Sequence, residues 1–98
     1  MHRYAAILQL AAGQPALAEA RLRQAVALAE PNPRSDISHC LLGVALAREQ
    51  RLAEARPLLG EGCAANRLGF VDPMIARWIA QARASAGMRD APAHAATR

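Results

Sequence analysis

The sequence predicts an all-α fold, and three observations lead to that prediction. The 98-residue chain contains 25 alanines, and alanine has the highest intrinsic helix propensity. Only three residues are aromatic, and the β-branched residues that strands favour are scarce. Apolar residues recur at spacings of three and four, which is the period of one face of a helix. A chain of this length buries enough surface for one core, so we expect one domain of about five short helices.

A glycine and a proline place the first two helices. A helical pattern covers about residues 1–12 and ends before Gly13, because glycine commonly follows the last turn of a helix. Pro15 begins a second pattern that runs to Ala29, since proline is tolerated in the first turn of a helix. The prolines within residues 30–34 predict a turn.

The third and fourth helices cross at small residues. The third helix is capped by Ser35 or Asp36 and runs to about residue 49. The fourth is expected over residues 52–66, with a bend or local mobility around Pro57, which lacks a backbone N–H, and Gly60. Gly43 within the third helix costs about 1 kcal/mol relative to alanine, so we expect the fourth helix to approach it closely at Ala55.

The fifth helix has a clear start signal. Asp72 supplies an N-cap and Pro73 follows at the first helical position. The pattern ends near Gly87, and its apolar stripe predicts that Trp78 is largely buried against the fourth helix. Residues 88–98 have no periodicity and are expected to form a disordered tail.

A repeat of 37 residues relates these helices. A fixed period is the sequence signature of a repeat protein. The residues that coincide in all three copies are Ala6, Gly43 and Ala80, then Gly13, Gln50 and Gly87, and the first two copies also align Ala18, Leu22 and Ala25 with Ala55, Leu59 and Gly62.

The repeat resembles the tetratricopeptide repeat, whose first helix carries an apolar residue followed by a small one, and whose second carries small, large apolar and small residues. The matching residues are Leu42, Gly43, Leu46, Ala55, Leu59 and Gly62. The resemblance implies an α-solenoid of antiparallel helical hairpins, with repeats over residues 1–34 and 35–71 and a capping helix over residues 72–87. The period of 37 exceeds the family's usual length of about 34, and we place the extra residues in the turns between repeats.

The resemblance also implies a function. In tetratricopeptide repeats the first helix of each hairpin lines a concave groove, so this chain is expected to be a scaffold that binds a partner protein or peptide. Arginines at the edge of an apolar floor would suit a partner with apolar anchors and an acidic group, because arginine binds carboxylates bidentately. The register places in the groove Arg3, Ile7, Leu10, Cys40, Val44, Ala47, Arg48, Arg77 and Gln81.

Two other functions stay open. Exposed apolar end faces of a short solenoid would favour a homodimer. RNA binding by a related helical repeat is disfavoured, because Arg3, Cys40 and Arg77 stand at equivalent positions without a repeated polar code. The net charge of +4 permits an acidic partner without requiring nucleic acid.

Little of the sequence indicates chemistry. There are no paired carboxylates, phosphate-binding loop, nucleophile motif or metal-ligand spacing, so we expect neither an enzyme nor a cofactor or metal site. Cys40 and Cys63 are expected to be buried or half-buried free thiols in a reducing compartment, with a disulfide as the alternative.

The sequence also bears on localisation. All 12 basic residues are arginine, which together with the many alanines suggests a GC-rich bacterial genome. No stretch is long and apolar enough to span a membrane, so a cytoplasmic protein is expected. Residues 1–13 could instead be read as a signal peptide, and a periplasmic location would follow if they are processed or the chain is a fragment.

Overall fold

The computed structural model describes residues 2–29, 35–60, 63–64 and 72–88, and these residues contain five helices and no strand. This confirms the predicted all-α class. The helices are α1 His2–Ala11, α2 Pro15–Ala29, α3 Ser35–Arg48, α4 Leu52–Leu58 and α5 Pro73–Ser85.

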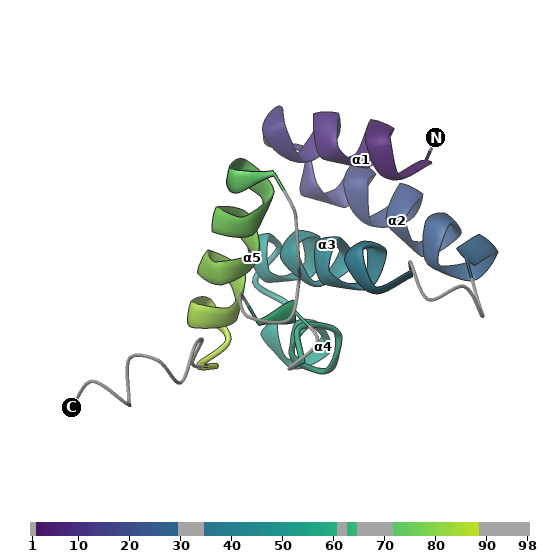
Figure 1. Cartoon of the computed structure of the whole chain (residues 1–98). Helices are drawn as coiled ribbons and strands as arrows, with labels where there is room; N and C mark the ends of the chain where they lie inside the picture. The colour runs from purple at the N-terminus through teal and green to yellow at the C-terminus, as the bar shows by residue number, and fades with distance from the viewer. Residues whose placement is uncertain (1, 30–34, 61–62, 65–71, 89–98) are drawn as a thin grey trace.

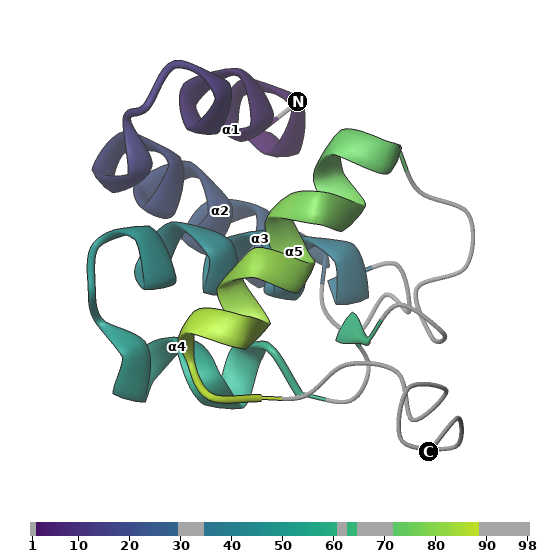
Figure 2. The same cartoon turned by 90° about the vertical axis from the view of Figure 1, so that its left-hand side faces the viewer.

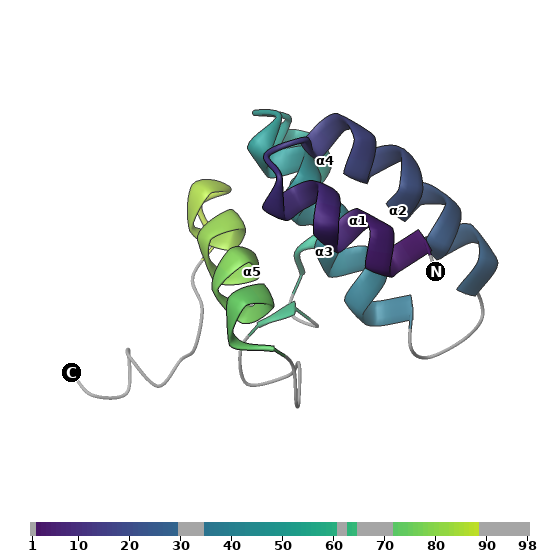
Figure 3. The ribbon, with the colours of Figure 1, turned by 90° about the horizontal axis from the view of Figure 1, so that it is seen from above.

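The first four helices are stacked in chain order, and the fifth lies across them. α1 contacts α2, α2 contacts α3, and α3 contacts α4, so two successive hairpins lie one on the other (Figure 1). α5 packs on α3 and crosses it steeply instead of running alongside it, as the turned view also shows (Figure 2). Seen from above, α5 lies beyond one end of the α1–α2 hairpin (Figure 3).

α3 is the central helix because its sequence has no polar face along most of its length. Every residue from Cys40 to Ala47 is buried. A helix that is apolar on all sides is stable only when other elements surround it, and α2, α4 and α5 do so here. Each large apolar side chain buried in this way contributes roughly 1.5 to 3 kcal/mol. The largest fully buried side chains are Leu10, Leu22, Leu41, Leu46, Leu59 and Ile79.

Three helices end in the same way at the repeat spacing of 37 residues. Gly13, Gln50 and Gly87 have backbone φ angles of 76°, 65° and 78°. Each is followed by a residue whose N–H donates to a carbonyl five residues earlier, as in the Schellman motif. The period in the sequence therefore corresponds to a repeated local structure, and the predicted ends at Gly13 and Gly87 are confirmed.

The start of α5 is also as predicted. Asp72 lies at the N-cap, where its Oδ1 accepts a hydrogen bond from the Met74 N–H at 2.7 Å, and Pro73 takes the first helical position. At the other end, Met88 is half-buried against the core, so the packed region extends one residue beyond the predicted boundary of the tail. Residues 89–98, the rest of the predicted tail, lie outside the described residues.

The predicted extent of the fourth helix was wrong. α4 ends at Leu58, not at Asn66, because Leu59 leaves the helix and packs against Gly43 of α3, and the chain then bends at Gly60. The predicted bend is therefore present, and it ends the helix. Gly62 and Asn66 lie outside the described residues.

The predicted crossing of α3 and α4 at Gly43 is present, but the residue that approaches it is Leu59. A Cβ placed on Gly43 would lie 2.5 Å from Leu59 Cγ. Real Cβ atoms do not approach another atom so closely, so any side chain at position 43 would force Leu59 to move. The three atoms nearest to that Cβ all belong to Leu59, so the large side chain at the end of α4 covers the glycine. The approach of Ala55, which is fully buried, stays a prediction.

The prediction of free thiols was also wrong. Cys40 of α3 and Cys63 form a disulfide, with their Cα atoms 5.7 Å apart. The sequence register placed Cys63 inside a long fourth helix that would point it elsewhere. Because α4 ends early, the chain instead turns back and brings Cys63 against α3.

Two arginines connect α4 and α5. Arg83 of α5 is only 4% exposed, and its Nη1 donates to the carbonyls of Leu59 and Gly60, the latter at 2.7 Å. In the opposite direction, Arg56 of α4 donates from Nε and Nη2 to the carbonyl of Ala86, the C-cap residue of α5, at 3.0 and 2.7 Å. Carbonyls at a helix C-terminus have no partner within the helix, and a cation there also interacts favourably with the helix dipole.

A cluster of ion pairs joins the two hairpins. Arg51, which follows α3, lies 2.8 Å from Glu19 of α2 and 2.8 Å from Glu54 of α4, and Glu19 also pairs with Arg23 at 2.9 Å. Burial raises the pKa of Glu49 at the end of α3, and the neighbouring Glu19 carboxyl raises it further. Burial would also raise the pKa of Glu19, but its contacts with Glu49, Arg23 and Arg51 hold that pKa below its ordinary value.

Candidate functional site

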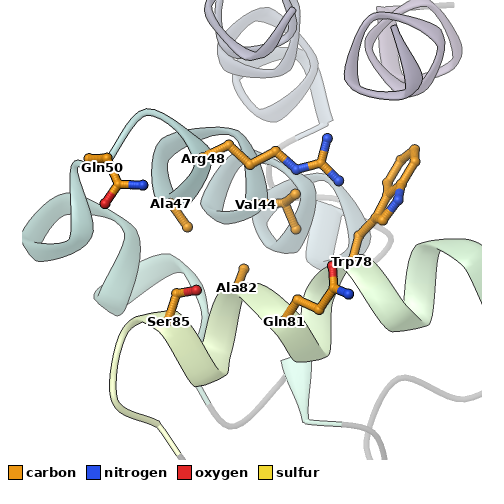
Figure 4. A pocket seen from close by; sticks show the side chains of 8 residues that line it. All are labelled: Val44, Ala47, Arg48, Gln50, Trp78, Gln81, Ala82 and Ser85. Carbon is orange, nitrogen blue, oxygen red and sulfur yellow. The ribbon is translucent and has the colours of Figure 1, made fainter. Parts of the chain in front are cut away.

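α3 and α5 enclose a pocket at the surface, which we call the α3–α5 pocket. Its volume is about 300 Å³. The axes of the two helices diverge at this point because α5 crosses α3, and their facing side chains form the walls of the pocket (Figure 4). The lining residues are Val44, Ala47, Arg48 and Gln50 from α3 and the turn after it, and Trp78, Gln81, Ala82 and Ser85 from α5.

Helical spacing explains why these residues face one another. Val44, Ala47 and Arg48 are separated by three and four positions, so they lie on one face of α3. The lining residues of α5 follow the same rule over two turns, at positions 78, 81, 82 and 85. Gln50 joins them because its left-handed backbone conformation ends α3 beside the pocket.

Arg48 is held in place by two contacts. The carbon of its guanidinium lies 4.9 Å from the centre of the Trp78 ring, a distance at which a cation is attracted to the ring face. Its Nη1 also donates to the carbonyl of Leu10, near the end of α1, at 2.9 Å. Figure 4 shows the side chain extending along the pocket toward Trp78. These contacts reduce the rotamer freedom that a free arginine would lose on binding a ligand.

The pocket carries one positive charge over a mostly apolar floor. Arg48 is the only charged residue among those lining the pocket, and no carboxylate opposes it there. The floor comes from Val44, Ala47 and Ala82, and the edges carry two amides and a hydroxyl. Such a surface favours an anionic group next to an apolar one.

The structure brings together four of the residues that the sequence predicted for the groove, namely Val44, Ala47, Arg48 and Gln81. Arg77 is exposed on α5, one turn before Gln81, but does not line the pocket. Of the three arginines expected at the edge of the groove, Arg3, Arg48 and Arg77, the pocket lining includes Arg48 alone.

The remaining predicted groove residues do not form a continuous groove. Leu10 and Cys40 are each 1% exposed in the core, and Cys40 is in the disulfide. Ile7 is half-buried against the core. The side chain of Arg3 lies outside the described residues. Leu10 contributes to the site only through its carbonyl. The register placed these residues on the concave side, but Leu10 and Cys40 belong to the buried core and Ile7 packs against it.

Sequence reasoning missed the role of Trp78. The prediction that it is largely buried against the fourth helix was wrong, since it is half-buried and lines the pocket beside α3. The direction in which α5 crosses α3 decides this, and no local pattern encodes that direction. The spacing of Trp78 with Gln81 and Ser85 was a usable signal, because it places an aromatic ring and two polar side chains on one helical face.

Gln50 was missed as well, although the repeat contained the signal. It occupies the helix-ending position that glycine takes in the other two copies. A non-glycine residue in the left-handed region is strained, and such strain is concentrated at functional sites. Within the described part of the chain, no three His, Cys, Asp or Glu side chains are placed to hold a metal ion.

Comparisons with protein-family models, with curated proteins and with solved structures gave no match. No helix in the described ranges has the length and apolar character needed to cross a membrane.

Proposed function

We propose that this chain is a protein-interaction module that binds an acidic segment of a partner protein in the α3–α5 pocket. The observation that carries the proposal is the fixed position of Arg48, held between the Trp78 ring and the Leu10 carbonyl above an apolar floor. An arginine oriented in advance loses less entropy when it binds a carboxylate, and its planar guanidinium can make two parallel hydrogen bonds to one.

The shape of the site favours a peptide segment as the ligand. The pocket is open to the surface, and its volume of about 300 Å³ is at the lower end of the range for small-molecule sites. It would admit one or two side chains of an extended segment. Gln50, Gln81 and Ser85 offer hydrogen-bond donors and acceptors to the main chain of such a segment.

We also propose that the fold is a short array related to the tetratricopeptide repeat. The helix ends at positions 13, 50 and 87 support a repeated unit, as do the two stacked hairpins. The steep crossing of α5 is a departure, and it is what opens the pocket. In this proposal the chain has no catalytic activity and requires no cofactor.

The disulfide bears on the compartment. Disulfides form and persist in oxidising compartments and are rare in the cytosol of mesophiles. The Cys40–Cys63 bond therefore supports a periplasmic or extracellular location over the cytoplasmic one that the sequence predicted.

Fluorescence of Trp78 tests the proposed function directly, because it is the only tryptophan of the chain and it lines the pocket. The probe is a set of capped pentapeptides that pair one leucine or phenylalanine with one glutamate, and the same peptides with glutamine. We expect the glutamate peptides to change the Trp78 emission saturably. Arg48→Gln should abolish that response, whereas Arg21→Gln on the exposed surface of α2 should not. Equal responses to glutamate and glutamine peptides would overturn the proposal.

Self-association is a second candidate, favoured by a separate observation. Tyr4, Leu8 and Leu17 are 66%, 54% and 52% exposed on the two helices of the α1–α2 hairpin. A second copy could cover them. Light scattering on the full chain would reveal a dimer, and Leu8→Glu should then restore the monomer.

A further inference from the structure

The disulfide lies next to the α3–α5 pocket. Cys40 precedes Val44 of the pocket by one turn of α3. Cys63 follows the bend at the end of α4. Both cysteines are buried, at 1% and 4% exposure. The bond therefore ties the rigid central helix to the chain segment that leads away from α4.

A series of contacts connects this bond to α5. The N–H of Cys63 donates to the carbonyl of Gly60 at 2.8 Å. The same carbonyl accepts a hydrogen bond from Nη1 of Arg83, at 2.7 Å. Arg83 belongs to α5 and adjoins Ala82 of the pocket. The disulfide thus fixes the position of Cys63, and the hydrogen bond from Cys63 fixes the bend at Gly60. The carbonyl at that bend in turn binds the buried guanidinium of Arg83 in α5.

We infer that the Cys40–Cys63 disulfide is a redox switch for the α3–α5 pocket. The intact bond keeps the pocket formed in the oxidised chain, and a dithiol reductant cleaves the bond and loosens the pocket. Opening the bond frees the bend after α4, weakens the hold on Arg83 and loosens α5. Because α5 supplies half of the residues lining the pocket, the reduced chain binds its partner weakly. This inference rests on the proposed function for its consequence, but not for the structural change itself.

The chemistry of the switch is ordinary thiol–disulfide exchange. Because both sulfurs are buried, exchange begins when the segment after α4 opens locally and exposes the bond. A thiolate of the reductant then attacks one sulfur, forming a mixed disulfide and releasing the other cysteine, which takes up a proton. The second thiol of the reductant then displaces the cysteine that is still bound in the mixed disulfide, and this cysteine also takes up a proton. The reductant, oxidised by two electrons, leaves as a cyclic disulfide, and the protein now contains two thiols.

The rest of the fold does not depend on this bond directly. α1 and α2 pack on each other through their own buried residues, among them Ala6, Leu10, Ala18 and Leu22. The ion pair between Arg51 and Glu19 ties that hairpin to the end of α3. Reduction should therefore act on α5 and leave the α1–α2 hairpin folded, as expected of a protein whose parts open separately.

Hydrogen exchange of the full chain, oxidised and then reduced with dithiothreitol, tests the inference without any ligand. We expect the amides of α5 from Ile79 to Ser85 to exchange at least about tenfold faster after reduction, while those around Leu22 change by less than about twofold. The Trp78 emission should shift to longer wavelength. The variant Cys40→Ala with Cys63→Ala should match the reduced chain and ignore the reductant.

The outcomes separate the inference from the proposed function. If α5 exchanges at the same rate in both states, or if all helices accelerate equally, the switch is refuted. If the oxidised chain binds no glutamate peptide, the proposed function fails while the exchange data still decide the switch. If the oxidised and reduced chains bind such a peptide equally well, the proposed function stands and the redox control fails.

Discussion

The Arg48 guanidinium lies over the Trp78 ring at 4.9 Å and so connects α3 with α5 across the pocket. The pair has two roles in our account. It holds the two walls of the pocket together, since a partly exposed cation–π contact contributes about 0.5 to 1 kcal/mol. It also presents an oriented positive charge to a ligand. The following predictions test the packing and electrostatics on which this arrangement depends.

The first prediction concerns the crossing of α3 and α4. Gly43→Ala should destabilise the protein by about 1 to 3 kcal/mol, because the added Cβ would lie 2.5 Å from Leu59 Cγ. Gly60→Ala is the matched control, since the nearest atom to its added Cβ is 3.8 Å away. Urea unfolding followed by circular dichroism measures both. Equal stabilities for the two variants would mean that the crossing is looser than described.

The second prediction concerns Gln50, whose φ angle is 65°. Gln50→Gly should stabilise the fold by up to about 1 kcal/mol, because glycine adopts the left-handed conformation without a steric cost. The same change should weaken peptide binding, since it removes an amide from the edge of the pocket. Thermal unfolding and a peptide titration test the two effects. A variant that loses stability would show that the side chain of Gln50 compensates its strain.

The third prediction is a pH dependence that originates at Glu49. Its pKa is raised above the ordinary 4.5 in the folded chain, so the protonated form is favoured by folding. The stability that it contributes is present below the unfolded pKa and is lost as the pH rises through the folded pKa. Glu49→Gln should therefore raise the thermal midpoint at pH 7, by an amount equivalent to less than about 1 kcal/mol, and have little effect at pH 3.

Glu19 provides the control for that prediction, because its pKa is shifted the other way. The stability that Glu19 contributes is present above its unfolded pKa and is lost as the pH falls through the folded pKa. Glu19→Gln should therefore lower the thermal midpoint at pH 7. The account of this cluster fails if both variants change the midpoint in the same direction.

The fourth prediction compares the two arginines that join α4 and α5. Arg83→Met should destabilise the protein by about 1 to 3 kcal/mol, because it removes the guanidinium donor from the buried Leu59 carbonyl and leaves the Gly60 carbonyl with only the Cys63 N–H. Arg56→Met removes hydrogen bonds from Ala86 at a more exposed position and should cost less. Denaturant midpoints at one temperature give the comparison. A larger loss for Arg56→Met would contradict the role given to the bend at Gly60.

Local signals in the sequence predicted most of the helix boundaries. Asp72 and Pro73 at the start of α5, and the glycines after α1 and α5, act through the backbone of a few neighbouring residues, so they can be read without the fold. The end of α4 was harder, because Pro57 is compatible both with a bent helix and with a terminated one. The choice depends on the packing of Leu59 against Gly43, which is a tertiary contact.

The site was predicted only in part for a related reason. Val44, Ala47, Arg48 and Gln81 could be assigned from their place in the repeat. Trp78 could not, because its surroundings depend on how α5 crosses α3, and the disulfide could not, because it follows from the early end of α4. Both features thus come from contacts between parts of the chain that are distant in sequence.

The most direct test of the central claim, that Arg48 binds an acidic group of the partner, is a double-mutant cycle by calorimetry. It measures the affinity of a glutamate peptide and its glutamine counterpart for the oxidised protein and for Arg48→Gln, with Arg21→Gln as the control. We predict a coupling between Arg48 and the peptide carboxylate of about 1.5 to 3 kcal/mol, the usual value for a charged hydrogen bond, and none for Arg21. If replacing the glutamate costs the same affinity with and without Arg48, the claim is contradicted.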